Sequence, residues 1–488
     1  MQNNNAAWGA GAVCAAMLAT AALPIRAAAD ERDYAIIVEA IEADREITND
    51  LADRIWDLAE LGYQEHLSSE LLQNRLALAG FDVEAGIAGL PTAFRATYRR
   101  GQGGGVIGVL AEFDALPGIS QDRTPERAIL PARDAGHACG HNLFGAGSVE
   151  AAIAVAAWMD ETDTAGEIRV YGTPAEEGGS GKVYMARAGV FDDVDAVLHW
   201  HPDDENSASP ANNLANRSAR FTFTGVSAHA AGAPERGRSA LDGVEAMDFM
   251  VNMMREHMPS DARIHYVITS GGSAPNVVPD HAEVYYYVRH PDVRELEHLW
   301  DRVVRAAEAA AMGTETEVSV EVMHGNLALL PNETLQAQLH RNLLTVSDIN
   351  YTADEAAFVR ALQSTMDGAP IGHNPSSVQD YRLRQTYGST DVGDVSWVAP
   401  TGGMRAATWA PGTAAHSWQA VAASGSSVGH KGMEVAAKAL ALTATDLLMD
   451  ESLRARVRGE FEDRRGRGFT YRPLLGDRDP PLDYREAD

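Results

Sequence analysis

The chain has 488 residues, of which 45% are hydrophobic and 22% are charged. This composition is typical of globular proteins and excludes a disordered chain, a collagen or a coiled coil as the main state. At about 150 residues per domain, the length predicts two to four domains. The 40 Lys and Arg residues against 69 Asp and Glu residues give a formal net charge of −29. Such a chain repels phosphate backbones and anionic membrane surfaces, so we expect no nucleic-acid partner.

The first 29 residues differ from the rest. Residues 6–25 are rich in alanine and uncharged, and Ala27-Ala28-Ala29 matches the small residues of a signal-peptide cleavage site. We interpret residues 1–29 as a secretory signal peptide and expect an exported protein, periplasmic or secreted, with no membrane span after processing; a cytoplasmic protein is the alternative. The two cysteines are Cys14 and Cys139, so cleavage leaves one thiol and no internal disulfide.

After the leader, the chain alternates between helical and extended patterns. Residues 30–79 repeat apolar side chains at intervals of three and four, which predicts helix. Short apolar runs at 106–110, 168–171 and 196–198 predict buried strands, and the small apolar segment 143–159 predicts a buried helix. This alternation indicates an α/β fold, a mixed sheet flanked by helices.

The pattern changes between residues 218 and 325. The expected elements are a strand at 220–224, a helix at 239–256, strands at 264–269 and 283–288, a helix at 293–312 and a strand at 317–322. The order β-α-β-β-α-β is that of a ferredoxin-like domain. We therefore expect a ferredoxin-like α+β lid or dimerisation domain, 218–325, inserted into a catalytic domain formed by 30–217 and 326–470. An extended tail, 471–488, completes the chain.

Three short motifs carry side chains suited to metal chemistry. Cys139 and His141 flank a glycine, which lets the backbone bend so that both reach one site. Glu176 and Glu177 follow a predicted strand, and a metalloenzyme needs one carboxylate as ligand and another as proton carrier. His201 follows the next strand, and the carboxyl ends of parallel strands meet at one edge of a sheet. Taken singly, a structural Cys-x-His pair or a solvated acidic loop explains each motif.

In their order along the chain, these motifs resemble the co-catalytic metallo-aminohydrolases, a superfamily with aminoacylases, glutamate carboxypeptidases and auxin-conjugate hydrolases. The resemblance runs from about residue 35 to 450 and is strongest to the aminobenzoyl-glutamate hydrolase branch, in its B-subunit form. The segments that carry it are 111–117, 139–142, 174–178, His201, 389–397, 416–418 and 429–433.

The resemblance implies a two-metal centre and hydrolysis of the amide bond of an N-acyl or N-aroyl amino acid. The implied ligands are Cys139, His141, Glu177, His201 and His416. Glu176 matches the general base that takes a proton from a metal-activated water. Many members have His-x-Asp where this chain has Glu112-Phe113-Asp114. The Cys139 thiolate then replaces the missing histidine, and Asp114 supports the ligands. A thiolate favours Zn, and the other ligands also admit Mn, so we expect two divalent ions, Zn or Mn.

The lid supplies further implied site residues. His229 resembles the lid histidine that reaches a neighbouring subunit's site and stabilises the oxyanion, which implies a dimer. Asn276 and Arg289 match positions that hold the substrate, and an Arg fork suits its carboxylate. An ion pair between Arg289 and Asp292 is the alternative.

Other interpretations stay open at this point. The chain is an aminobenzoyl-glutamate-type hydrolase, a dipeptidase, a general aminoacylase, or a non-catalytic binding subunit of a hetero-oligomer. The complete ligand set and Glu176 argue against the last of these. Activity that requires a related partner subunit is a further alternative to a homodimer. Asp391 and Asp394 either support the metal ligands or cap a loop, and we favour the loop cap. The methionines between residues 247 and 258 are interpreted as core or dimer-interface packing.

Overall fold

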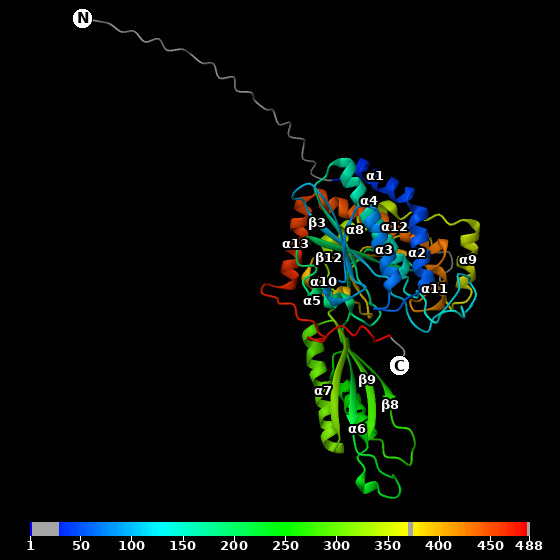
Figure 1. The fold of residues 1–488 in the computed structure, drawn as a ribbon, viewed down its shortest axis with the longest axis vertical. Coiled ribbons are helices and arrows are strands. Elements are labelled where there is room, and N and C mark those ends of the chain that lie inside the picture. The colour runs from blue at the N-terminus through cyan, green and yellow to red at the C-terminus, as the bar shows by residue number, and fades with distance from the viewer. Residues whose placement is uncertain (2–28, 369–373, 486–488) are drawn as a thin grey trace.

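The computed structural model describes residue 1, residues 29–368 and residues 374–485. The predicted signal peptide therefore lies almost wholly outside the described residues, as does Cys14. Figure 1 shows a larger part, in which helices cover a sheet, and a narrower part that projects from it. The chain enters the narrow part once and returns from it, which is the predicted insertion.

The larger part is built on a six-stranded mixed sheet with the strand order β1-β2-β4-β3-β5-β12. β4, β3, β5 and β12 run parallel to one another, whereas β2 pairs antiparallel with both β4 and the edge strand β1. The strands are β1 (Asp82–Ala85), β2 (Phe94–Arg100), β3 (Val106–Ala111), β4 (Gly166–Gly172), β5 (Ala196–Asp203) and β12 (Thr401–Ala407). The mixed α/β sheet expected from the sequence is confirmed.

Helices cover both faces of this sheet. They are α1 (Glu31–Ala43), α2 (Arg45–Leu58), α3 (His66–Leu78), α4 (His141–Thr162), α5 (Gly181–Arg187), α8 (Glu333–Val346), α9 (Ala353–Gln363), α10 (Val392–Val398), α11 (Trp418–Ser424), α12 (Ser427–Met449) and α13 (Glu451–Arg465). Among the described residues, α4 alone is long and apolar enough to span a membrane, and 89% of its apolar window is buried within the protein. Its small residues, Gly145 and Gly147 among them, let α4 pack closely between the sheet and α12.

The narrow part is the predicted ferredoxin-like domain. Its four antiparallel strands have the order β10-β7-β9-β8, and two helices pack on one face. Its elements are β7 (Ala215–Thr224), α6 (Ala240–Met254), β8 (Arg263–Ser270), β9 (His281–His290), α7 (Val293–Thr314) and β10 (Glu317–Asn326). Phe221, Tyr286 and Trp300 form an aromatic core between sheet and helices. β8 is an edge strand, so one of its sides pairs with no strand of the described chain.

The remaining elements are short. A two-stranded parallel pair joins β6 (Ala211–Asn212) to β11 (Arg384–Gln385), and single 3-10 turns are η1 (Ile87–Gly89), η2 (Pro234–Arg236) and η3 (Arg255–His257). Residues 471–485 form neither helix nor strand and cross the junction between the two parts, drawn in red in Figure 1.

Candidate metal centre

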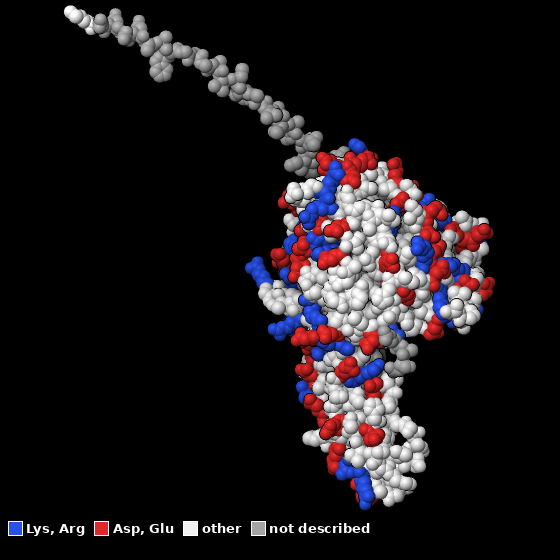
Figure 2. Space-filling model, viewed as in Figure 1, with Lys and Arg blue, Asp and Glu red and all other residues white. Residues whose placement is uncertain are grey.

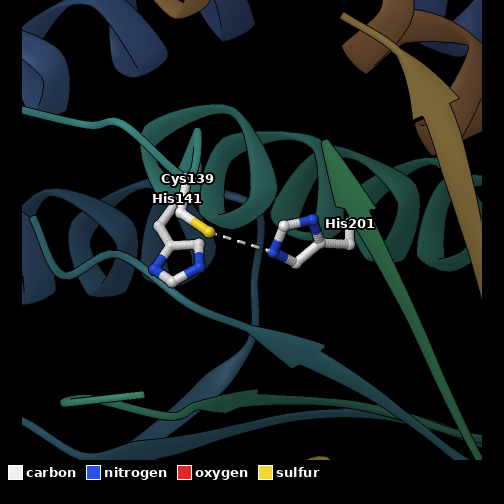
Figure 3. A group of neighbouring side chains, drawn as sticks. All are labelled: Cys139, His141 and His201. Carbon is white, nitrogen blue, oxygen red and sulfur yellow. Dashed lines mark hydrogen bonds between the residues drawn. The ribbon is translucent and has the colours of Figure 1, made fainter. Parts of the chain in front are cut away.

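The centre lies beyond the carboxyl ends of β4 and β5, where potential metal ligands from distant segments converge. Cys139 and His141 come from the start of α4, and His201 comes from β5 (Figure 3). Cys139 Sγ lies 3.4 Å from His201 Nε2, and one ligand atom from each of the three residues falls within 4.8 Å of the others. This arrangement offers one sulfur and two nitrogens to a single ion.

Two more triads overlap the first. Cys139, Glu177 and His416 form the second, with His416 Nε2 3.6 Å from the thiol and 3.3 Å from Glu177 Oε1. Glu112, His141 and Glu176 form the third. The structure thus brings together all five ligands implied by the sequence and the implied base. It adds Glu112, which sequence reasoning assigned to no role.

Local backbone geometry explains how these side chains meet. Gly140 caps α4 with φ 73°, a left-handed conformation, and a Cβ there would lie 2.7 Å from Pro202 Cβ. β5 continues through Asp203, so His199 and His201 share one face of the strand. His199 fits because its neighbour Gly403 has no side chain; a Cβ there would lie 2.0 Å from His199 Nε2.

Buried hydrogen bonds fix the orientation of the ligands. Asp114 accepts from His141 Nδ1 at 2.8 Å and from the backbone N–H of Glu177 at 2.9 Å, so it orients two implied ligands at once. Lys182 is fully buried, and its Nζ lies 2.7 Å from both Glu112 and Asp391. Its charge offsets two of the carboxylates packed behind the centre.

The pKa shifts of the buried groups show that negative charge exceeds positive charge at the centre. Burial raises the pKa of Glu176 well above its usual range, and Glu112 and Glu177 raise it further. Burial also raises the pKa of the Cys139 thiol. For His141, burial lowers the pKa, but Glu112 and Asp114 outweigh it and leave the pKa well above the usual value. A cation placed among these groups reverses the shifts of the carboxylates and the thiol.

The donor set fits a divalent metal centre. Glu112 Oε2 and His141 Nε2 are buried and lie 3.1 Å apart, and the buried Glu177 Oε1 lies 3.3 Å from His416 Nε2, but none of the three forms a hydrogen bond of good geometry with a described residue. Buried polar atoms of this kind are costly unless something binds them, and a shared cation would bind them all. A thiolate, imidazoles and carboxylates together suit a borderline ion with mixed S, N and O ligands.

A cavity of about 460 Å³ opens beside the donor set and is lined by Glu176, His201 and two arginines. Arg405 pairs with Asp203, and Arg384 Nη1 lies 2.6 Å from Glu205. Sequence reasoning missed both arginines. Arg405 follows two glycines on β12, and these interrupt the apolar pattern that identifies a strand. A larger groove of about 700 Å³ between α1, α8 and α12 contains no metal-ligand cluster of the described residues.

The implied lid residues lie apart from this cavity. His229 and Asn276 are exposed on adjacent loops, joined by a hydrogen bond from the Ala230 N–H to the Asn276 carbonyl. Arg289 is half-buried on β9 and forms no ion pair with Asp292 or any other described residue. The alternative ion pair is therefore absent, and the guanidinium is available to another anion.

Comparison with known proteins gives one consistent relationship. A family model for the peptidase dimerisation domain matches residues 215–315. The chain is 40% identical to the B-subunit of p-aminobenzoyl-glutamate hydrolase from Escherichia coli (strain K12), over 86% of this chain and 93% of that protein. It is 31% identical to the Xaa-Arg dipeptidase of Mus musculus, over 87% and 91%.

A solved structure shares the fold: a dinuclear metal-binding peptidase of the M20 family from Bacillus subtilis, with a TM-score of 0.56 at 16% identity, covering 83% of this chain and 99% of that one. The identity to the hydrolase of Escherichia coli extends over both parts of the fold. The chain belongs to the M20 family of peptidases and aminohydrolases, and it is a metal-dependent amidohydrolase.

Proposed function

We propose that this chain hydrolyses the amide bond between an aroyl or acyl group and an amino acid that carries a terminal carboxylate. Aminobenzoyl-glutamate is the best-supported substrate. The observation that carries the proposal is the convergence of Cys139, His141, Glu177, His201 and His416 beside Glu176. The 40% identity to the hydrolase of Escherichia coli supports the choice of substrate.

The chain's own residues divide the chemistry. Two divalent ions held by the five ligands, when bound, polarise the amide carbonyl and acidify a water molecule. Glu176 lies within the cluster, so its carboxylate is placed to accept the water proton and to return it to the leaving nitrogen. Asp114 keeps the His141 ring in the tautomer whose Nε2 faces the site.

His229 is suited to donate to the oxyanion. Its Nδ1 accepts hydrogen bonds from the backbone N–H groups of Ala231 at 3.2 Å and Gly232 at 3.0 Å. A neutral imidazole that accepts at Nδ1 carries its proton on Nε2, so Nε2 is a donor that points away from its own loop. The exposed ring can then enter the site of a neighbouring subunit.

Arg289 is the proposed anchor for the substrate carboxylate. On β9 it pairs across the lid sheet with Asn216 on β7, and Asn216 pairs in turn with Asn326 on β10. Both asparagines are buried, and Asn216 Oδ1 and both amide atoms of Asn326 have no described partner. A row of a free guanidinium and two amides favours a carboxylate ligand. Arg384 and Arg405 line the cavity beside the ligand cluster.

A dimer formed through the lid completes the site. Phe249 on α6 and Val267 and Ile268 on β8 are exposed apolar residues next to the unpaired edge of the sheet. In Figure 2 the β8 side of the lid carries few charged side chains, whereas the α7 side carries both signs. Two β8 edges can pair across a twofold axis and extend the sheet. We infer a homodimer, with a related partner subunit as the other form.

Zn or Mn is the proposed metal, since a thiolate ligand favours Zn and the remaining ligands admit Mn.

Export through the N-terminal segment is likewise proposed, because the alanine-rich leader ends in a cleavage-site pattern. Cleavage before Asp30, read by N-terminal sequencing of the protein from the periplasm or medium, is the expected result.

The experiment is hydrolysis of a substrate panel by the purified chain, after chelation and after return of Zn or Mn. The panel contains aminobenzoyl-glutamate, acyl amino acids with acidic and neutral side chains, and two dipeptides, one of them Xaa-Arg. We expect metal-restored release of glutamate. Glu176→Gln should keep its metal yet lose activity by about 10²- to 10⁴-fold, whereas Glu308→Gln, an exposed change on α7, should leave both unchanged.

Each other outcome has a definite meaning. A preference for the Xaa-Arg dipeptide would support the second candidate, a dipeptidase, which the 31% identity to such an enzyme favours. Bound metal without turnover until a related subunit is added would support the hetero-oligomer. No metal and no turnover would reject the site assignment itself.

A further inference from the structure

The C-terminal segment 471–485, here named the C-terminal strap, leads from the base of the lid to the loop that carries Glu176 and Glu177 (Figure 1). The sequence indicated only an extended tail. Hydrogen bonds and packing contacts hold the strap to the rest of the protein along most of its length.

The strap is fixed first at the junction of lid and catalytic domain. Tyr471 donates to Asp394 at 2.6 Å, and the other oxygen of Asp394 accepts from the backbone N–H of Leu327, just after β10. Leu474 is buried against Gly325, where a Cβ would lie 2.9 Å from the Leu474 carbonyl carbon. The first half of the strap is thus part of the packed junction and holds the second half in place.

Side chains of the catalytic domain then bind the strap's backbone. Arg187 on α5 donates to the carbonyls of Gly476 and Arg478, at 3.1 and 2.8 Å. Gln64 Nε2 donates to the carbonyl of Leu482 at 2.9 Å. Hydrogen bonds to main-chain carbonyls fix the path of the chain independently of the strap's own side chains.

The far end of the strap meets the metal-ligand loop. The carbonyl of Glu177 accepts from Tyr484 Oη at 3.2 Å and from Arg485 Nη2 at 2.5 Å. The Tyr484 ring packs edge-on against Tyr63, with 5.6 Å between ring centroids. A Cβ at Gly62 would lie 2.3 Å from Tyr484 Oη, so the absence of a side chain there makes room for the phenol.

The loop needs such support because its backbone is strained. Ala175 and Ser180 flank the two glutamates and have φ 57° and 59°, in the left-handed region that L side chains avoid. Such a conformation is unfavourable for a residue with a side chain and persists only where the surrounding contacts hold it in place. On the inner side, Glu65 accepts from the Ala175 N–H and Asp114 from the Glu177 N–H. The strap supplies the donors on the outer side.

We propose that Tyr484 and Arg485 are positioning residues, which hold the Glu177 carbonyl so that the Glu177 side chain points at the metal ions. Both backbone groups of Glu177 are then fixed, its N–H by Asp114 and its C=O by the strap. A guanidinium donor makes the second hydrogen bond charge-assisted, which strengthens it. The inference rests on the proposed role of Glu177 as a metal ligand.

The test compares metal affinity and kinetics of full-length variants. Arg485→Ala and the double variant Tyr484→Phe/Arg485→Ala remove the outer donors. Arg472→Ala is the matched control, an exposed arginine of the same strap with no ion pair or hydrogen bond to a described residue. Co²⁺ serves as the metal probe, because its visible absorption reports thiolate and carboxylate coordination. Chelator competition gives the affinity, and kcat and KM are measured at saturating metal.

We expect the double variant to bind Co²⁺ about 10- to 100-fold more weakly, the usual effect of removing a residue that orients a ligand. Its Co²⁺ spectrum should change, kcat should fall more than KM rises, and Arg485→Lys should recover part of the loss. Affinity and kcat within twofold of Arg472→Ala would overturn the proposal. Glu177→Ala separates the two inferences: if it also leaves affinity unchanged, the ligand assignment fails, and if it alone weakens binding, only the strap's role fails.

Discussion

Removing the buried lysine behind the metal centre should destabilise the protein far more than removing a lysine with the same contacts nearer the surface. Lys182 is fully buried, with Nζ 2.7 Å from carboxylates of Glu112 and Asp391 that are also buried. Lys438 Nζ likewise lies 2.7 Å from two carboxylates, on Glu42 and Glu434, but these are 46% and 19% exposed. The two lysines thus share distances and differ in burial.

Lys182→Met removes the cation that Glu112 and Asp391 share; Glu112 keeps His141 Nε2 at 3.1 Å, but the buried Asp391 loses its ion-pair partner, and breaking a buried pair in this way costs about 3–5 kcal/mol. Lys438→Met loses a solvent-screened interaction of about 1 kcal/mol or less. Urea unfolding of the metal-free variants, followed by circular dichroism, measures both. Lys182→Met/Asp391→Asn should recover at least about 1 kcal/mol, because one stranded charge is removed. Equal losses for the two lysines, or no recovery in the double variant, would refute the reasoning.

Three further outcomes follow from the structure. Burial raises the pKa of Asp394 to about 7, so the native state holds a proton that the unfolded state releases near pH 4. Ionised Asp394 therefore destabilises the fold as the pH rises from about 4 to 7. Over that range, the unfolding free energy of the wild type should fall relative to that of Asp394→Asn. A difference between the two proteins that does not change with pH would contradict this. Arg289→Met should raise KM on the order of 10- to 100-fold for substrates with a free carboxylate, measured by steady-state kinetics, while Arg263→Met, its neighbour in register on β8, should not. Ile268→Glu should yield monomers in analytical ultracentrifugation with loss of activity, whereas Leu344→Glu, at an even more exposed position on α8, should remain dimeric.

The sequence was informative where chemistry and local structure coincide. Cys139 and His141 needed only a glycine between them, and the structure gives that glycine a positive φ. His201 was placed at a strand end by a short apolar run, and β5 extends as far as Asp203. The lid's alternation of strands and helices predicted its ferredoxin-like order, and the sheet order confirms it. Each of these inferences uses neighbours within a few residues.

What the sequence did not reveal depends on contacts between distant segments. Lys182 forms ion pairs with Glu112, 70 positions away, and with Asp391, more than 200 positions away, and no local sequence pattern predicts such pairs. For Asp394 a loop cap was favoured over a role in supporting the metal ligands, and the structure shows that it accepts from the chain just after the lid and from the strap. The helical methionines divide: Met247 is buried in the lid core, while Met253 is half-exposed beside Phe249. Burial of this kind is decided by tertiary packing, which periodicity alone does not specify.

The charges at the centre favour two metal ions over one. Five carboxylates, on Glu112, Asp114, Glu176, Glu177 and Asp391, lie in the ligand cluster that contains the Cys139 thiol or directly behind it. With all six ionised and Lys182 as the buried cation among them, the site carries a formal charge of about −5. One divalent ion leaves about −3 in a buried region, whereas two leave about −1, which the N–H donors around the centre can stabilise. In the metal-free protein, burial and neighbouring carboxylates raise the pKa values of Glu112 and Glu176, so protons take the place of the ions. Metal binding therefore releases these protons, because ions and protons neutralise the same buried negative charges.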